Sequence, residues 1–188
     1  YDARTEQIIY DNTLLAGSGI VPGTMLLGIA LRADVVHRWP MPGNTFGEWR
    51  VRIGVASRDA AHAVPLFADN VVGGDDGYTT LRDDYLSIVI GSLPTQATQP
   101  SGPANPFGPF YAFDLPFIYT GTGEGIVVEI SHNGGTNWDY YLDAYARGSV
   151  PGSMSFAAVG FDAKNPPASS YSASAPQGSR GCAGDDST

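Results

Sequence analysis

The sequence predicts an all-β protein: a jelly-roll-like β-sandwich of about eight short strands, followed by a low-complexity C-terminal tail. Only 15% of the residues are charged, whereas 24 glycines and 14 prolines favour turns. Short segments alternate apolar and polar residues at a period of two, and turn-forming residues separate them. We therefore expect no helix longer than two turns.

The clearest element is a predicted β-hairpin at residues 125–145. Its first strand alternates, with Ile126, Val128 and Ile130 on one side. The turn that follows contains Gly134, which can adopt positive φ without a steric clash. The second strand also alternates, so one face should be core. The other face should form an acidic and aromatic row facing water, made of Asp139, Tyr141, Asp143 and Tyr145.

Six further segments predict the remaining strands. In one of them, Trp49, Val51 and Ile53 should point into the core, while Arg50 and Arg52 point out. The stretch 69–84 is acidic and glycine-containing, and it predicts a loop. The predicted strands are residues 5–12, 24–32, 49–56, 85–90, 110–119 with a bend near Pro116, and 153–162.

The strand at 24–32 is strongly apolar. Met25, Leu27, Ile29 and Leu31 lie on one face if the alternation is regular. Gly28 interrupts the other face, where it can allow a bulge or a close backbone approach.

Two regions of different composition divide the chain. Residues 1–164 can form one domain with its own core. Residues 165–188 consist mostly of Ser, Ala, Pro and Gly and have almost no large apolar side chains, which is typical of a tail that cannot bury enough surface to fold alone. The single cysteine, Cys182, cannot close an intramolecular disulfide.

The charge balance excludes several classes of partner. A formal net charge of −9 disfavours nucleic acid and anionic membrane surfaces, which need Lys and Arg. No apolar run is long enough to span a membrane. The acidic balance and a first residue that is not Met predict a mature extracellular or cell-surface protein.

Several short motifs across residues 5–145 carry a resemblance to a known family. They are residues 8–10 with 14–15, 29–34, 66–70, 115–119, and 127–130 followed by 142–144. In these motifs the chain resembles an uncharacterised secreted β-sandwich domain of environmental bacteria, found in planctomycete-type surface and extracellular proteins. The resemblance implies an extracellular β-sandwich and brings no assigned activity.

No catalytic motif is present, so we expect a protein that is not an enzyme. The three histidines share no motif, and the sequence has no G-x-S-x-G, no H-E-x-x-H and no phosphate-binding loop. Crowded acidic residues around 69–84 suit Ca²⁺, and the ligands would be Asp69, Asp75 and Asp76; the alternative is a solvated turn. No other cofactor is expected.

Two functions remain from the sequence. The first is a secreted structural protein that associates with copies of itself through its N-terminal strand and its tail, as a filament or surface-layer subunit. The tail would suit O-glycosylation at Ser169, Ser170, Ser172, Ser174 and Thr188. The alternative is a carbohydrate-binding or adhesive module that binds glycans on the row formed by Asp139, Tyr141, Asp143 and Tyr145. That row could equally be a ladder that only stabilises the sheet.

Overall fold

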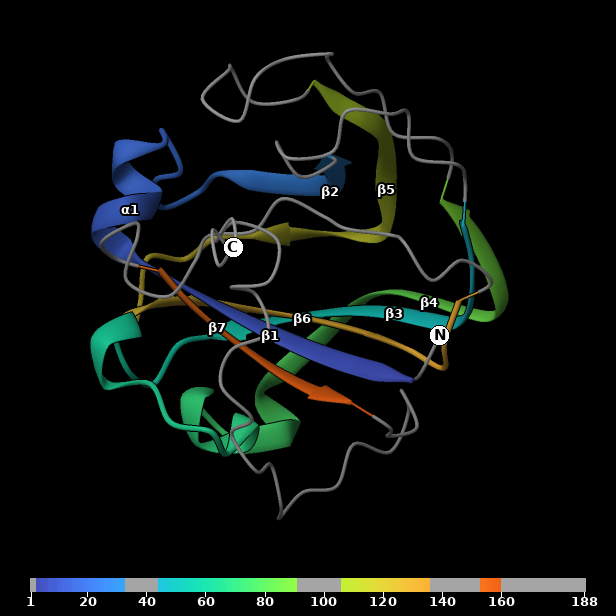
Figure 1. The fold of residues 1–188 in the computed structure, drawn as a ribbon. Helices are drawn as coiled ribbons and strands as arrows, with labels where there is room; N and C mark the ends of the chain where they lie inside the picture. The colour runs from blue at the N-terminus through green and yellow to red at the C-terminus, as the bar shows by residue number, and fades with distance from the viewer. Residues whose placement is uncertain (1–2, 33–43, 91–105, 136–152, 160–188) are drawn as a thin grey trace, which may run out of the picture.

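The computed structural model describes residues 3–32, 44–90, 106–135 and 153–159, and most of this part of the chain is β-strand (Figure 1). The all-β prediction is therefore confirmed. None of the described helices is long and apolar enough to cross a membrane. The strands are β1 (Arg4–Asp11), β2 (Met25–Arg32), β3 (Asn44–Val55), β4 (Tyr78–Ile90), β5 (Phe107–Ile118), β6 (Gly125–His132) and β7 (Ser153–Val159). The helical segments are α1 (Asn12–Gly17) and three 3-10 turns, η1 (Ala60–His62), η2 (Phe67–Asn70) and η3 (Gly74–Gly77).

The described strands form two antiparallel sheets. The larger has the order β4-β3-β6-β1-β7, and the smaller contains β2 and β5 (Figure 1). Strand β1 pairs with β6 on one side and with β7 on the other. The expectation that the N-terminal strand offers a free edge for assembly is therefore wrong, because both of its edges are already hydrogen-bonded.

The two sheets share a hydrophobic core. Trp49, Val51 and Ile53 of β3 are buried, as their alternation predicts. Tyr111 of β5 packs against the first two, and Ile126 of β6 belongs to the same side of the larger sheet as Ile53. Leu15 of helix α1 closes this core at one end. Period-two patterning thus predicted the inner face of the larger sheet correctly.

The opposite face of the larger sheet is also covered, which the sequence did not predict. The segment 56–77, with its three 3-10 turns, packs Ala60 and Val71 against Ile9 and Val127. Glu129 is completely buried on this side, although a carboxylate in a strand normally faces water. Strand β6 is therefore buried on both faces, because it lies in the middle of the sheet and under this second layer.

The predicted hairpin is confirmed only in its first half. Strand β6 spans Gly125–His132, and its neighbours are β1 and β3. The turn after it bonds to β3, where the Gly47 amide donates to the carbonyl of Gly134 at 3.0 Å. The predicted second strand lies in residues 136–152, outside the described residues.

The acidic stretch 69–84 is only partly a loop. It contains η3, and β4 then begins at Tyr78, seven residues before the predicted start. Leu81 is completely buried, whereas its neighbours Thr79 and Thr80 are exposed. A register irregularity between Val51 and Arg52 of β3 places Leu81 in the core beside Ile53.

Candidate functional site

The smaller sheet presents an apolar outer face. Six large apolar side chains of β2 and β5 are between 53% and 63% exposed, and we call these six the apolar face: Met25, Leu27, Phe107, Phe110, Leu115 and Ile118. Met25 and Ile118 lie directly opposite each other in the strand pair. Their neighbours Leu26 and Phe117 point the other way and pack in the core. The alternation of the two strands therefore leaves both sides of this sheet apolar.

A register irregularity between β2 and β5 accompanies this arrangement. The strand partners jump between Leu26 and Gly28, so regular alternation is interrupted at Leu27. As a result Met25 and Leu27 are exposed, while Ile29 and Leu31 pack in the core. The prediction that these four residues share one face is wrong for this reason. In β5 the same irregularity spans residues 113–116, and Figure 1 shows β5 sharply bent, as the sequence predicts near Pro116.

Gly28 supports the aromatic part of the apolar face. A Cβ atom at Gly28 would lie 2.4 Å from Cζ of Phe110 and 2.3 Å from the carbonyl oxygen of Tyr111. The Phe110 ring therefore rests on the bare backbone of Gly28 and presents its other side to solvent. No larger residue could hold Phe110 in this position.

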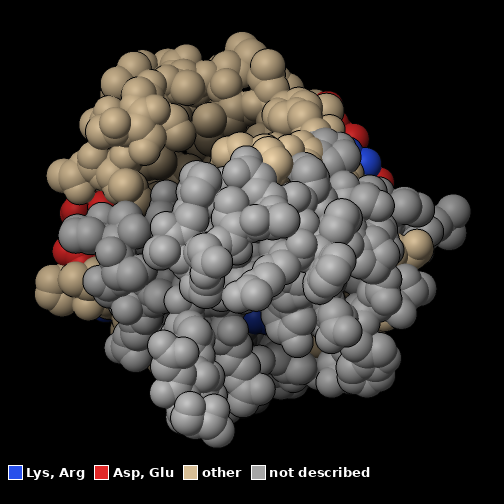
Figure 2. Space-filling view, turned by 45° about the horizontal axis from the view of Figure 1, so that its top comes forward, with Lys and Arg blue, Asp and Glu red and all other residues tan. Residues whose placement is uncertain are grey.

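Charged side chains lie beside β5, on the neighbouring strand β4. Arg82 donates from Nε to Asp84 at 2.6 Å and from Nη1 to the carbonyl of Ala112 in β5 at 2.8 Å. Asp84 raises the pKa of Arg82, and Asp114 of β5 acts in the same direction more weakly. Figure 2 shows an uncharged surface among the described residues, with both acidic and basic side chains at its margins.

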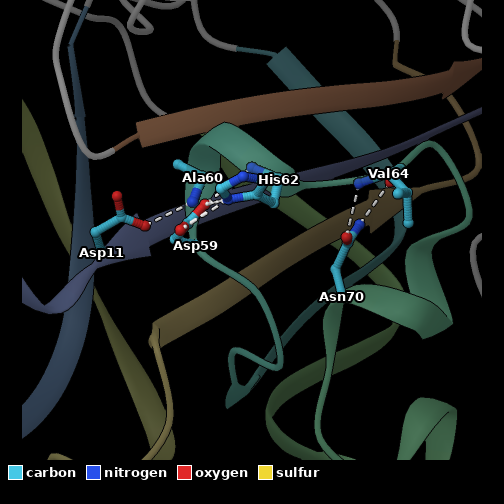
Figure 3. Close-up of polar contacts among 6 residues, drawn as sticks. All are labelled: Asp11, Asp59, Ala60, His62, Val64 and Asn70. Carbon is cyan, nitrogen blue, oxygen red and sulfur yellow. Dashed lines mark hydrogen bonds and ion pairs between the residues drawn. The ribbon is translucent and has the colours of Figure 1, made fainter.

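A histidine–aspartate pair lies on the segment that covers the other sheet face (Figure 3). Asp59 caps η1 by accepting from the His62 amide at 2.9 Å, and one of its oxygens lies 2.7 Å from His62 Nδ1. These bonds lower the pKa of Asp59. Asp11 of β1 accepts from the Ala60 amide at 2.7 Å, which ties η1 to the sheet. The Ser57 hydroxyl, the nearest in sequence, donates to a backbone carbonyl, so the pair acts as a cap without a bound nucleophile.

A buried amide pair fastens the covering segment to β1. Gln7 accepts from Asn70 Nδ2 at 2.8 Å and donates to the carbonyl of Phe67 at 3.0 Å. Asn70 also bonds to both backbone groups of Val64, as Figure 3 shows. Both side chains are completely buried, and these bonds satisfy them. This network is a structural clamp.

A buried ion pair between β3 and β6 lies on the same face of the larger sheet. Arg52 Nη2 is 2.6 Å from Glu129 Oε1 and 3.7 Å from Asp75. The guanidinium carbon of Arg52 lies 4.2 Å from the centre of the Tyr78 ring. Burial raises the pKa of Glu129, and Arg52 opposes this shift. Burial and the charge of Glu129 also raise the pKa of Tyr78.

His132 ends strand β6 in a buried position. Its ring packs on Phe46 with the ring centres 4.7 Å apart. Its Nδ1 accepts from the Gly134 amide at 3.0 Å, which requires an unprotonated nitrogen. Burial, helped by the positive charge of Arg4, lowers the pKa of His132 to about 4. The ring is therefore neutral at physiological pH and stabilises the turn by accepting this bond.

Of the site residues predicted from the sequence, the described part of the chain contains only the three proposed calcium ligands, Asp69, Asp75 and Asp76. Within the described residues, no three His, Cys, Asp or Glu side chains are grouped so that they could hold a metal ion. Of the three proposed calcium ligands, Asp75 lies beside Arg52 instead. The remaining predicted sites fall outside the described residues: the carbohydrate row of Asp139, Tyr141, Asp143 and Tyr145, and the O-glycosylation positions Ser169, Ser170, Ser172, Ser174 and Thr188.

Sequence reasoning missed the apolar face. The exposed residues of β2 and β5 belong to stretches that predict buried strands, and hydrophobicity alone cannot separate an exposed from a buried apolar side chain. Gly28 was the available signal, because a glycine inside a strand indicates a bulge or a close approach.

Comparison of the chain with protein-family models, curated proteins and solved structures gives no match. The resemblance to secreted bacterial domains stays a prediction. Function has to be argued from the geometry.

Proposed function

We propose that this chain is a secreted structural protein, without enzymatic activity, that associates with copies of itself outside the cell. Its two sheets would form a sandwich of jelly-roll type, the unit of a filament or surface layer. The apolar face of the smaller sheet carries the proposal. Six large apolar side chains that remain more than half exposed on two adjacent strands are unusual for a protein that works as a monomer.

The polar groups of the structure support a structural role. Gln7 and Asn70 use their amides to fasten one layer to another, and Asp59 is occupied by capping η1. Glu129 is occupied by Arg52. These groups stabilise the fold, whereas the six side chains of the apolar face remain more than half exposed.

For the N-terminal strand, the route of assembly differs from the one that the sequence suggested, while the tail at residues 165–188 lies outside the described residues. Strand β1 is paired on both edges and cannot accept a strand without losing one of its neighbours. Contacts through exposed apolar side chains need no such exchange. We therefore place the association on the smaller sheet.

Sedimentation velocity of the full chain over a concentration series tests self-association. We expect the average mass to rise with concentration above the 19.8 kDa of one chain. Added sodium sulfate should strengthen the association, because it screens the repulsion between copies of net charge −9 and favours apolar burial. A constant mass of one chain at every concentration, with and without sulfate, would refute the proposal.

A further inference from the structure

We infer that the apolar face is the contact between two copies of this chain, packed face to face about a two-fold axis. The inference rests on the proposed self-association through the smaller sheet and adds that the contact joins the same face of two copies in two-fold symmetry. The apolar face consists of Met25, Leu27, Phe107, Phe110, Leu115 and Ile118, as defined above.

The area of the apolar face suits such a contact. With about 200 Å² for a fully exposed large side chain, the six residues present roughly 600–700 Å². Two copies would bury roughly 1,300 Å² in total, at the lower end of stable protein interfaces. The area of this face in one copy exceeds the few hundred Å² of contiguous apolar surface that a monomeric protein usually exposes.

The positions of the residues favour one continuous contact. Met25 pairs with Ile118 across the two strands, so their side chains are direct neighbours. Phe110 pairs with Ala30 and covers Gly28, so a flat ring lies next to a position with no side chain. The ring fills the place that a side chain of Gly28 would take, and a flat apolar surface of this kind can pack against the same surface of a second copy turned by 180°.

Charge favours a second copy over a partner of opposite charge. The chain carries a net charge of −9, so two copies repel each other, and acidic groups at their contact would add to this repulsion. None of the six residues is charged. The charged residues of β2 and β5 are Arg32, which pairs with Phe107 at one end of the sheet, and Asp114, which acts on Arg82 of β4. An uncharged patch on a strongly acidic chain therefore matches the same patch on another copy.

A thin sheet also gains from being covered. A two-stranded sheet is only marginally stable in water unless it packs against another layer. Here the inner side packs on the larger sheet, while the outer side has no described layer on it. Face-to-face packing of two smaller sheets at about 10 Å would supply that layer in both copies.

Sedimentation equilibrium on the full chain and on Leu27→Asp tests the inference. Leu27 is 55% exposed, so aspartate at this position is compatible with the folded monomer. In a face-to-face dimer the two-fold axis brings two new carboxylates into one apolar contact. We expect the dissociation constant to rise about tenfold to a hundredfold, because an interface of this kind excludes unpaired charge.

Val72→Asp is the matched control. Val72 is 52% exposed but follows η2, in the segment that covers the opposite face of the larger sheet. The same charge is added, so a general effect of net charge would appear in both variants. We expect Val72→Asp to associate like the wild type.

The outcomes separate the inference from the proposed function. A wild type that stays monomeric up to about 1 mM, a range that detects weak interfaces, refutes both. A wild type that associates while Leu27→Asp associates equally well refutes the face and leaves self-association standing. If Val72→Asp weakens the association as much as Leu27→Asp does, the assignment of the contact to the apolar face is also refuted. If Leu27→Asp loses its circular dichroism spectrum, Leu27→Thr replaces it, with the same expected direction and the same refuting result.

Discussion

Acidification is expected to destabilise this protein through His132. The folded chain holds the ring neutral, buried against Phe46, with Nδ1 accepting the Gly134 amide. Protonation would convert this acceptor into a donor that faces another donor, close to the positive charge of Arg4. Since the ring resists protonation in the folded state, the unfolded state binds the proton first as the pH falls.

The size of the effect follows from the two pKa values. The pKa of His132 is about 4 in the fold, against a usual value of 6.5. Each pKa unit corresponds to about 1.4 kcal/mol, so the difference amounts to about 3 kcal/mol. The folded pKa is lowered, so this stability is fully present above pH 6.5. It is lost progressively as the pH falls from 6.5 to about 4. Such a loss is a large share of the about 5–15 kcal/mol that stabilises a typical domain.

Urea unfolding of the wild type and of His132→Asn, at several pH values between 7.5 and 4, measures this contribution. Asparagine does not titrate, and its side-chain oxygen can still accept the amide two residues ahead. Glu129 acts in the opposite sense, because its raised pKa makes the fold take up a proton as the pH falls. At each pH we take the difference in the free energy of unfolding between the wild type and His132→Asn. The contributions of Glu129 and of every other group that titrates in both proteins cancel in this difference. We expect the wild type to lose about 3 kcal/mol relative to the variant by pH 4. A difference that stays constant with pH would refute the reasoning.

Two further predictions concern single side chains and are measured as the free energy of unfolding at pH 7. Glu129→Gln should cost about 2–4 kcal/mol, because it leaves the mostly buried Arg52 without its close counter-ion. Asp75→Asn should cost under about 1 kcal/mol, because Asp75 is half exposed and lies 3.7 Å from Arg52. Equal costs for the two variants would contradict the ranking. Gly28→Ala should cost about 2–4 kcal/mol, because the new Cβ meets a backbone oxygen at 2.3 Å, while Gly17→Ala, with open space around it, should be close to neutral. If Gly28→Ala had the same free energy of unfolding as the wild type, β2 and β5 would be able to move apart to admit the new Cβ, and the prediction would be wrong.

The inner face of the larger sheet could be predicted residue by residue. Trp49, Val51 and Ile53 alternate with arginines, and a strand has no other way to bury all three. The same argument holds for Ile126, which is buried as predicted. Helix α1, which places Leu15 at the end of the core, was not predicted.

The second covered face could not be predicted in this way. Glu129 and Gln7 are polar, and polar residues in a strand normally indicate a face in water. They are buried because partners distant in the chain satisfy them: Arg52 lies 77 residues from Glu129, and Asn70 lies 63 residues from Gln7. A period-two pattern contains no information about such pairs.

The apolar face shows the same division most clearly. From the sequence alone, one could determine that this is an all-β chain with low charge, that 24–32 and 110–119 are apolar strands, and that Gly28 interrupts one of them. Only the tertiary structure decided which of these apolar residues are core and which are exposed. The reason is physical: the pairing of β2 with β5 is irregular between Leu26 and Gly28, and the alternation of faces changes there, so Leu27 faces solvent while Ile29 packs inside.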